Sequence, residues 1–121
     1  MGSHKDLIVW QKSIELADIV LVATDNFPNA QRFSLTKQLQ NCIVSVPSNI
    51  AEGSARGTKK EFIHFLHIAR GSLAEADTQL IIANRRGYIT SKKYDDINML
   101  ATQVGRMLTK LIQTLKNSKG D

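Results

Sequence analysis

The sequence predicts an all-α protein, an antiparallel up-down four-helix bundle whose second helix is kinked by a proline. Apolar residues recur at helical spacing in four segments, at about 6–24, 34–53, 58–85 and 91–117. Short connections rich in turn residues separate these segments, and none of them shows the alternating pattern of a strand. The 121 residues suffice for a single domain, 1–121, with one core.

The first predicted helix is more apolar than a four-helix bundle requires. Its core-facing stripe repeats three and four residues apart: Leu7, Trp10, Ile14, Ala17, Leu21 and Thr24. Other apolar side chains lie outside that stripe: Val9, Leu16, Ile19, Val20 and Val22. Later helices add a smaller surplus: Ile63, Ile81, Ile82 and Ile112. Since monomers rarely expose a patch of this size, we expect subunit contacts to bury these side chains.

The second segment keeps its apolar spacing through Pro47, so we expect one kinked helix rather than two. Proline has no N–H, which leaves the carbonyl of Ile43 without its helical partner. Three nearby polar side chains could replace that hydrogen bond: Ser45, Ser48 and Asn49. Gly53 is expected to end the helix, because glycine is common just past a helix C-terminus.

The third and fourth segments carry recognisable start signals. Thr58 and Glu61 have the spacing of a capping box, and Ser91 is the expected cap of the fourth helix. Gly71 and Ser72 leave room for the middle of the second helix to approach the third. The core stripe of the third helix is Phe62, Leu66, Ala69, Leu73, Ala76, Leu80 and Ala83. That of the fourth is Ile97, Leu100, Val104, Met107 or Leu108, Leu111 and Leu115.

A set of polar side chains on the second and third helices accompanies the proline: Ser45, Ser48, Asn49, Glu52, Ser72, Glu75 and Gln79. One interpretation is a structural cluster of hydrogen bonds that fixes the register of the two helices. The other is a groove that binds a ligand or nucleic acid. Both interpretations remain open at this point.

The formal net charge of +5 is concentrated in one part of the chain. Residues 51–93 carry eight basic and four acidic side chains, whereas residues 1–50 carry four of each. If nucleic acid binds, six basic residues are the expected phosphate contacts: Arg56, Lys59, Lys60, Arg70, Arg85 and Arg86. The same excess also suits an acidic protein partner or an ordinary solvated surface.

No pattern in the sequence indicates catalysis, a metal site or a cofactor. Glu61 and His64 have the Glu-x-x-His spacing of di-iron bundles, but no second such pair exists. The single Cys42 excludes an internal disulfide and is expected to be buried. We also see no membrane-spanning segment and no signal peptide before Trp10, so we expect a cytoplasmic protein.

The motif Ser-Val-Pro-Ser-Asn-Ile-Ala-Glu-Gly at residues 45–53 is shared with a known family. Further residues carry the likeness: Arg56, Phe62, Phe65, Leu66, Ala69, Gly71, Ser72, Glu75, Gln79, Gly87 and Tyr88. From about Trp10 to the last helix, the chain resembles the four-helix-bundle family of 23S ribosomal RNA intervening-sequence proteins. That family includes the accessory variability determinant of diversity-generating retroelements. It usually has a basic residue just before the small-apolar run, where this chain has Asn41.

The resemblance implies an up-down four-helix bundle that assembles into a ring-shaped homopentamer, without established enzymatic activity. We therefore expect a non-enzymatic, homo-oligomeric binding or scaffold protein. Its partner would be RNA, DNA or a nucleoprotein such as a reverse transcriptase with its RNA. The alternative is a purely structural oligomer that binds an acidic protein partner.

Overall fold

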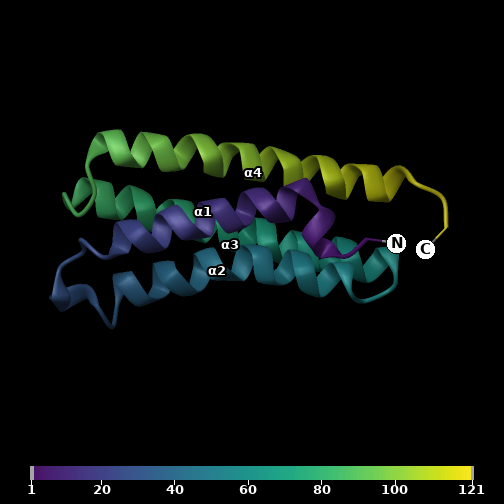
Figure 1. Cartoon of the computed structure of the whole chain (residues 1–121), viewed down its shortest axis with the longest axis horizontal. Coiled ribbons are helices and arrows are strands. Elements are labelled where there is room, and N and C mark those ends of the chain that lie inside the picture. The colour runs from purple at the N-terminus through teal and green to yellow at the C-terminus, as the bar shows by residue number, and fades with distance from the viewer. Residues whose placement is uncertain (1, 121) are drawn as a thin grey trace.

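The computed structural model describes residues 2–120 and contains four long helices, of which neighbouring helices run antiparallel (Figure 1). They are α1 (Ile8–Thr24), α2 (Leu35–Ser54), α3 (Lys59–Arg85) and α4 (Ser91–Asn117). Two short 3₁₀ helices precede α1 and α2, namely η1 (His4–Asp6) and η2 (Asn29–Gln31). The described residues contain no strand, so the predicted fold class is confirmed. Met1 and Asp121, the ends of the predicted domain, lie outside the described residues.

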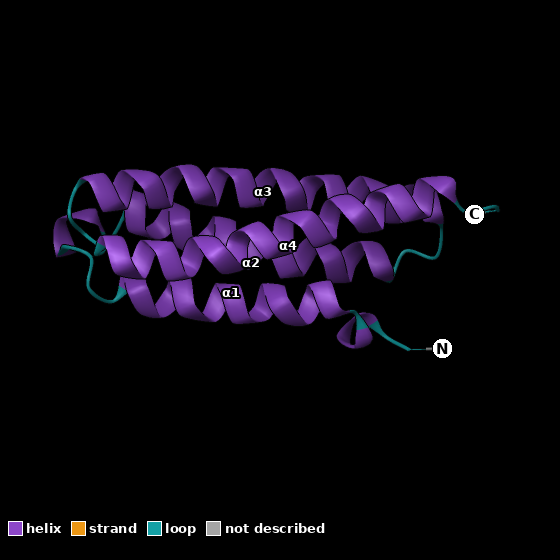
Figure 2. Cartoon of the chain, turned by 90° about the horizontal axis from the view of Figure 1, so that it is seen from above, coloured by secondary structure: helices purple, strands orange, loops and turns teal. Residues whose placement is uncertain are grey.

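The four helices form a square in which α1 packs on α2, α2 on α3, α3 on α4, and α4 on α1. Between residues 2 and 120, no Cα atoms of diagonally opposed helices approach within 8 Å. Figure 2 shows the helices along a common axis, with η1 standing off the start of α1. The α1/α2 side and the α3/α4 side are therefore opposite faces of the bundle.

The buried side of α1 matches the predicted one only in part: Ala17 and Thr24 are buried as predicted, but other positions differ. Val9, Leu16 and Val20 lie in the core, and Leu16 and Val20 have no exposed surface. Ile14, predicted to face the core, is instead 42% exposed. Both stripes have helical spacing, so periodicity alone could not choose between them. The expectation that Val9, Leu16 and Val20 form subunit contacts is therefore wrong.

The other surplus apolar side chains divide between core and surface. Ile19 and Ile63 are half-buried and pack against the core, and Ile112 is part of it. Val22, at 56% exposure, and Ile82, at 44%, stay on the surface. In α3 the predicted core stripe from Leu66 to Ala83 is buried, whereas Phe62 is half-buried. In α4 Ile97, Val104 and Leu108 are buried as predicted, together with Ala101 and Ile112.

Helix α2 passes through Pro47 without interruption, as predicted, and a kink at that residue stays a prediction. The amide nitrogen of Asn49 donates to the carbonyl and to the hydroxyl of Ser45, both at 2.8 Å. The side-chain hydrogen bonds at the proline therefore reach the carbonyl of Ser45 rather than that of Ile43.

Gly53 lies inside α2 rather than at its end, because the helix continues to Ser54. A Cβ atom at Gly53 would lie 2.7 Å from the Cβ of Phe65, whereas a Cβ at Gly71 would meet nothing within 4 Å. The close approach that was expected at Gly71 and Ser72 is therefore confirmed at Ser72, which contacts Ser45 in the middle of α2, but not at Gly71, and a second close approach occurs at Gly53. The turn into α3 is made by Gly57, whose φ of 92° favours glycine.

The cap of α3 follows the prediction only in part. The hydroxyl of Thr58 accepts the N–H of Glu61 at 3.2 Å. The Glu61 carboxylate accepts a hydrogen bond from the same hydroxyl, so the reciprocal half of the capping box is absent here. At α4 the cap is Thr90 rather than Ser91, and its hydroxyl accepts the N–H of Lys93 at 3.1 Å.

Candidate functional site

Three of the predicted polar residues come together between α2 and α3. The hydroxyls of Ser45 and Ser72 are 2.9 Å apart, and Asn49 donates to Ser45. Ser72 is buried, so this contact replaces the water that its hydroxyl would otherwise bind. The three side chains form a hydrogen-bonded link across the helix pair, not an open cleft.

The remaining four polar residues lie apart from that link. Glu52 pairs with Arg56 at 3.6 Å, and Gln79 donates weakly to the sulfur of Cys42 at 3.7 Å. Cys42 is half-buried rather than buried. Ser48 and Glu75 are exposed. The seven residues therefore do not form one site.

The six predicted phosphate contacts do not form one surface either. Arg85 and Arg86 end α3, whereas Lys59 and Lys60 begin it, about 40 Å away at 1.5 Å per residue. Arg56 is partly neutralised by ion pairs with Glu52 at 3.6 Å and Glu61 at 3.7 Å. Lys59 donates to the carbonyl oxygen of Ser118, just past the end of α4, at 2.7 Å. Arg70 belongs to a larger group of cations further along the same pair of helices.

That group lies where the first half of α3 packs against the second half of α4. We call it the α3/α4 basic face, and its members are His64, His67, Arg70, Arg106, Lys110 and Lys116. The surrounding sequence has no carboxylate between Phe62 and Ala74, and none between Ile97 and Gly120. Positive charge therefore accumulates here without acidic residues on the same stretches of helix.

Arg70 is held in place at the centre of this face. One guanidinium nitrogen donates to the hydroxyl of Thr109 at 3.3 Å, and another lies 3.1 Å from Nδ1 of His67. Loss of solvent around its ring lowers the pKa of His67, and the charges of Arg70, Lys116 and His64 lower it further. His67 is thus favoured in its neutral form, in which Nδ1 can accept a hydrogen bond from Arg70.

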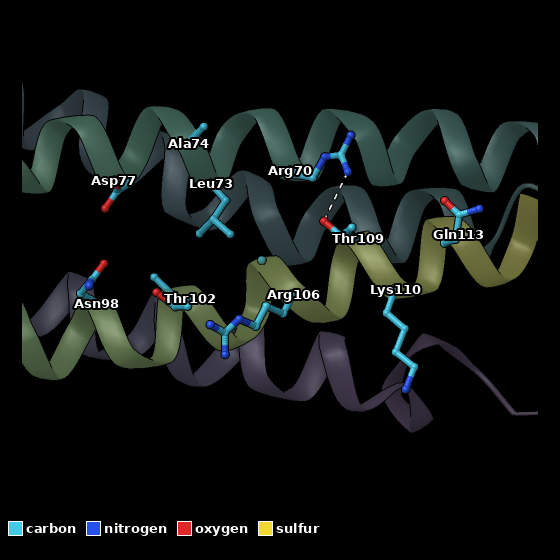
Figure 3. A pocket seen from close by; sticks show the side chains of 12 residues that line it. Arg70, Leu73, Ala74, Asp77, Asn98, Thr102, Arg106, Thr109, Lys110 and Gln113 are labelled. Carbon is cyan, nitrogen blue, oxygen red and sulfur yellow. Dashed lines mark hydrogen bonds between the residues drawn. The ribbon is translucent and has the colours of Figure 1, made fainter.

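A groove of about 760 Å³ runs along this face between α3 and α4 (Figure 3). Its floor is made of small and apolar residues: Leu73, Ala74, Ala101 and Gly105. Lys110 extends away from α3, and Arg106 lies along the same outer edge of α4 (Figure 3). Asp77, the one carboxylate among the residues that line the groove, lies at the end opposite Lys110 and Gln113.

A second groove, of about 430 Å³, lies on the opposite face between α1 and α2. Most of its lining is apolar: Trp10, Ile14, Ala17, Leu21, Val44, Pro47 and Ala51. Ile14 is 42% exposed and Val44 is 44% exposed, so two large aliphatic side chains border it. We call this surface the α1/α2 apolar face.

Two classes of site are absent from the part of the chain that the structure describes. Residues 2–120 contain no group of three or more His, Cys, Asp or Glu side chains that could hold a metal ion. No described helix is both long and apolar enough to cross a membrane.

Sequence reasoning missed Arg106, Lys110 and Lys116. Their helix begins with Asp95 and Asp96, which made the charge of the fourth segment look balanced. The distribution of carboxylates along α4 could have revealed these cations. In the described residues of α4 every carboxylate precedes Ile97, whereas Arg106, Lys110 and Lys116 follow it.

The comparisons with known proteins agree with this fold. A family model described as 23S rRNA-intervening sequence protein matches residues 5–110. The chain is also similar to a protein with unknown function from the S23 ribosomal protein family of Bacteroides thetaiotaomicron, whose crystal structure is known. The two share 29% sequence identity and a TM-score of 0.81, over 88% of this chain and 96% of the other. No curated protein matches the sequence.

Proposed function

Since the chain belongs to the family of 23S rRNA-intervening sequence proteins, we propose that it is a non-enzymatic, homo-oligomeric protein that binds nucleic acid or a nucleoprotein through the α3/α4 basic face. The observation that carries this proposal is the absence of carboxylates along the two helix segments that form that face. Cations grouped in this way can neutralise the phosphate groups of a nucleic acid, and such a patch is the electrostatic footprint of nucleic-acid binding.

The contacts of the basic residues support a role in binding rather than in folding. Ion pairs in the described residues involve Lys12, Arg56 and Lys92, and none involves a member of the α3/α4 basic face. Arg106 and Lys110 are exposed and leave their charge open to an outside partner. Arg70 is oriented by protein hydrogen bonds, yet it meets no carboxylate.

The α1/α2 apolar face supports the proposed self-assembly. It combines Ile14 and Val44 with the half-buried Trp10 beside a groove, and a second copy of the chain would remove these groups from water. Because this face lies opposite the α3/α4 basic face, assembly would leave the cations free. A closed ring of five, as the family resemblance implies, would present several basic faces to one nucleic acid.

Salt-dependent binding tests the proposal. Fluorescence anisotropy with a labelled RNA should give an association constant that falls steeply with salt, with a log–log slope of about −0.7 per single-strand phosphate contacted. The double variant Arg106→Gln/Lys110→Gln should reduce the magnitude of that slope by about 1.4. Arg32→Gln/Lys37→Gln is the matched control, because it removes the same charge from exposed side chains near the start of α2, outside the α3/α4 basic face. Absence of binding to RNA and DNA at low salt would overturn the proposal in favour of a scaffold for an acidic protein.

A further inference from the structure

The α3/α4 groove has two kinds of surface that lie side by side. The cations Arg106 and Lys110 follow its outer edge on α4, four residues apart and so about 6 Å along the helix. The floor next to them is apolar, and Leu73 points from α3 into the space between the helices (Figure 3). A ligand that fits both surfaces carries regularly spaced negative charge on one side and flat apolar groups on the other.

Arg70 adds a planar group at this floor. Its guanidinium is fixed by Thr109 at 3.3 Å and His67 at 3.1 Å, so it does not need to be ordered when a ligand binds. Unstacked nucleic-acid bases are commonly held on the planes of Arg guanidinium groups as well as on aromatic rings. The groove itself is lined without an aromatic residue, which leaves Arg70 as its flat polar platform.

We propose that the nucleic acid bound at the α3/α4 basic face is single-stranded, with phosphates along the Arg106–Lys110 edge and bases in the groove against Arg70. This inference rests on the proposed function and names its substrate class. A duplex turns its phosphates outward and hides the faces of its bases, so it can use the cations but not the apolar floor. A single strand uses both surfaces.

The hydroxyl and amide groups around the groove favour binding of single strands with little preference for base sequence. Thr102 lies on the groove wall, Asn98 near its Asp77 end and Gln113 near its other end (Figure 3). These flexible side chains can donate to or accept from any base edge, but they do not form the bidentate pairs that read one base. The carboxylate of Asp77 repels phosphate at its end of the groove, so we expect the bound strand to leave the groove before it reaches Asp77.

The test compares one RNA sequence as a single strand and as a blunt duplex, each with a 2-aminopurine at a central position. At low salt the single strand should bind about tenfold or more tightly, because stacking of one base contributes on that order. The 2-aminopurine fluorescence should rise when the single strand binds, since the base leaves its neighbours for the groove. The duplex should bind weakly and without this rise.

Arg70→Lys separates stacking from charge. It keeps the positive charge and removes the guanidinium plane, so it should abolish the fluorescence rise and the preference for the single strand while duplex affinity stays unchanged. Arg106→Gln/Lys110→Gln should instead weaken both forms of RNA. The control Arg32→Gln/Lys37→Gln should change neither.

The possible outcomes distinguish a failure of the single-strand inference from a failure of the proposed function. Equal affinity for the two forms without a change in fluorescence would overturn the single-strand inference and leave the proposed function intact. No binding of either form would overturn both. If an acidic amphipathic peptide then bound with sensitivity to Arg106→Gln/Lys110→Gln, the occupant of the groove would be a protein helix.

Discussion

Replacing Gly71 by alanine should raise the free energy of unfolding, whereas the same replacement at Gly53 should not. Both residues lie inside helices, so each substitution adds the same methyl group and restricts the unfolded chain equally. In an exposed helix interior this change stabilises by about 1 kcal/mol. A Cβ at Gly71 would have no neighbour within 4 Å, so we expect nearly the whole gain there.

At Gly53 the same methyl group would be forced against α3. Its Cβ would lie 2.7 Å from the Cβ of Phe65 and 3.2 Å from the backbone oxygen of Phe62. Neither atom is the flexible tip of a side chain, so the two helices would have to separate, at an overpacking cost of about 1–3 kcal/mol. That cost offsets or exceeds the gain in helix propensity. Gly53 is also the next-to-last residue of α2, where alanine gains less helix propensity than in a helix interior, so the two free energies of unfolding should differ by at least about 1–3 kcal/mol.

Urea denaturation followed by far-UV circular dichroism measures this difference. All proteins should be compared at one concentration, because assembly makes the apparent stability concentration-dependent. If the free energy of unfolding depends equally steeply on urea concentration in all proteins, a shift in the denaturation midpoint reports a change in stability alone. If Gly53→Ala and Gly71→Ala shifted the midpoint upward by the same amount, the close contact between α2 and α3 would not be a constraint and the reasoning would be refuted.

Three further predictions concern the polar link, the assembly and the effect of pH. Asn49→Leu should lower the free energy of unfolding by about 1–3 kcal/mol, because Ser45 loses the hydrogen bonds that Asn49 donates. Pro47→Ala should leave the fold intact. Equal denaturant midpoints for Asn49→Leu and the parent would contradict the first expectation. Ile14→Glu or Val44→Glu should reduce the mass measured by light scattering from several times 13.5 kDa to that of one chain, with helical content retained, and a monomeric parent protein would refute the idea of assembly. The third prediction concerns His67, whose pKa in the folded protein lies below the ordinary 6.5, so the unfolded chain binds more protons near that pH. Stability should fall as pH is lowered through 6.5, and less so in His67→Gln; identical pH profiles would rule out this linkage.

The helices could be predicted from the sequence because their signals are local. Cap residues, Pro28 and turn glycines fix where each helix begins and ends, and apolar spacing shows which segments are helical. The orientation of α1 could not be predicted in the same way. Its two stripes, one with Ile14 and one with Leu16, are both apolar and both at helical spacing. Only the packing of α2 and α4 against α1 selects the stripe with Leu16.

The close approach between α2 and α3 was predicted at Gly71 and Ser72, and only Ser72 takes part in it, for a related reason. A glycine inside a helix shows that a side chain is missing, but not on which side of the helix. Gly71 faces solvent, whereas its neighbour Ser72 faces Ser45 across the interface. A rotation of about 100° per residue separates adjacent positions, so one residue is enough to turn a buried contact into an exposed one.

The α3/α4 basic face depends on an arrangement that no local pattern contains. Arg70 lies in the first half of α3, and Arg106 and Lys110 lie in the second half of α4, so the chain brings them together only because the two helices are antiparallel. In a parallel arrangement Asp95 and Asp96, at the start of α4, would lie beside that half of α3 and neutralise part of the charge. The fold itself gains nothing from grouping like charges, which repel one another at this separation. A surface that is mildly unfavourable in the free protein becomes favourable when an anion covers it, and this is the physical argument for a phosphate-bearing partner.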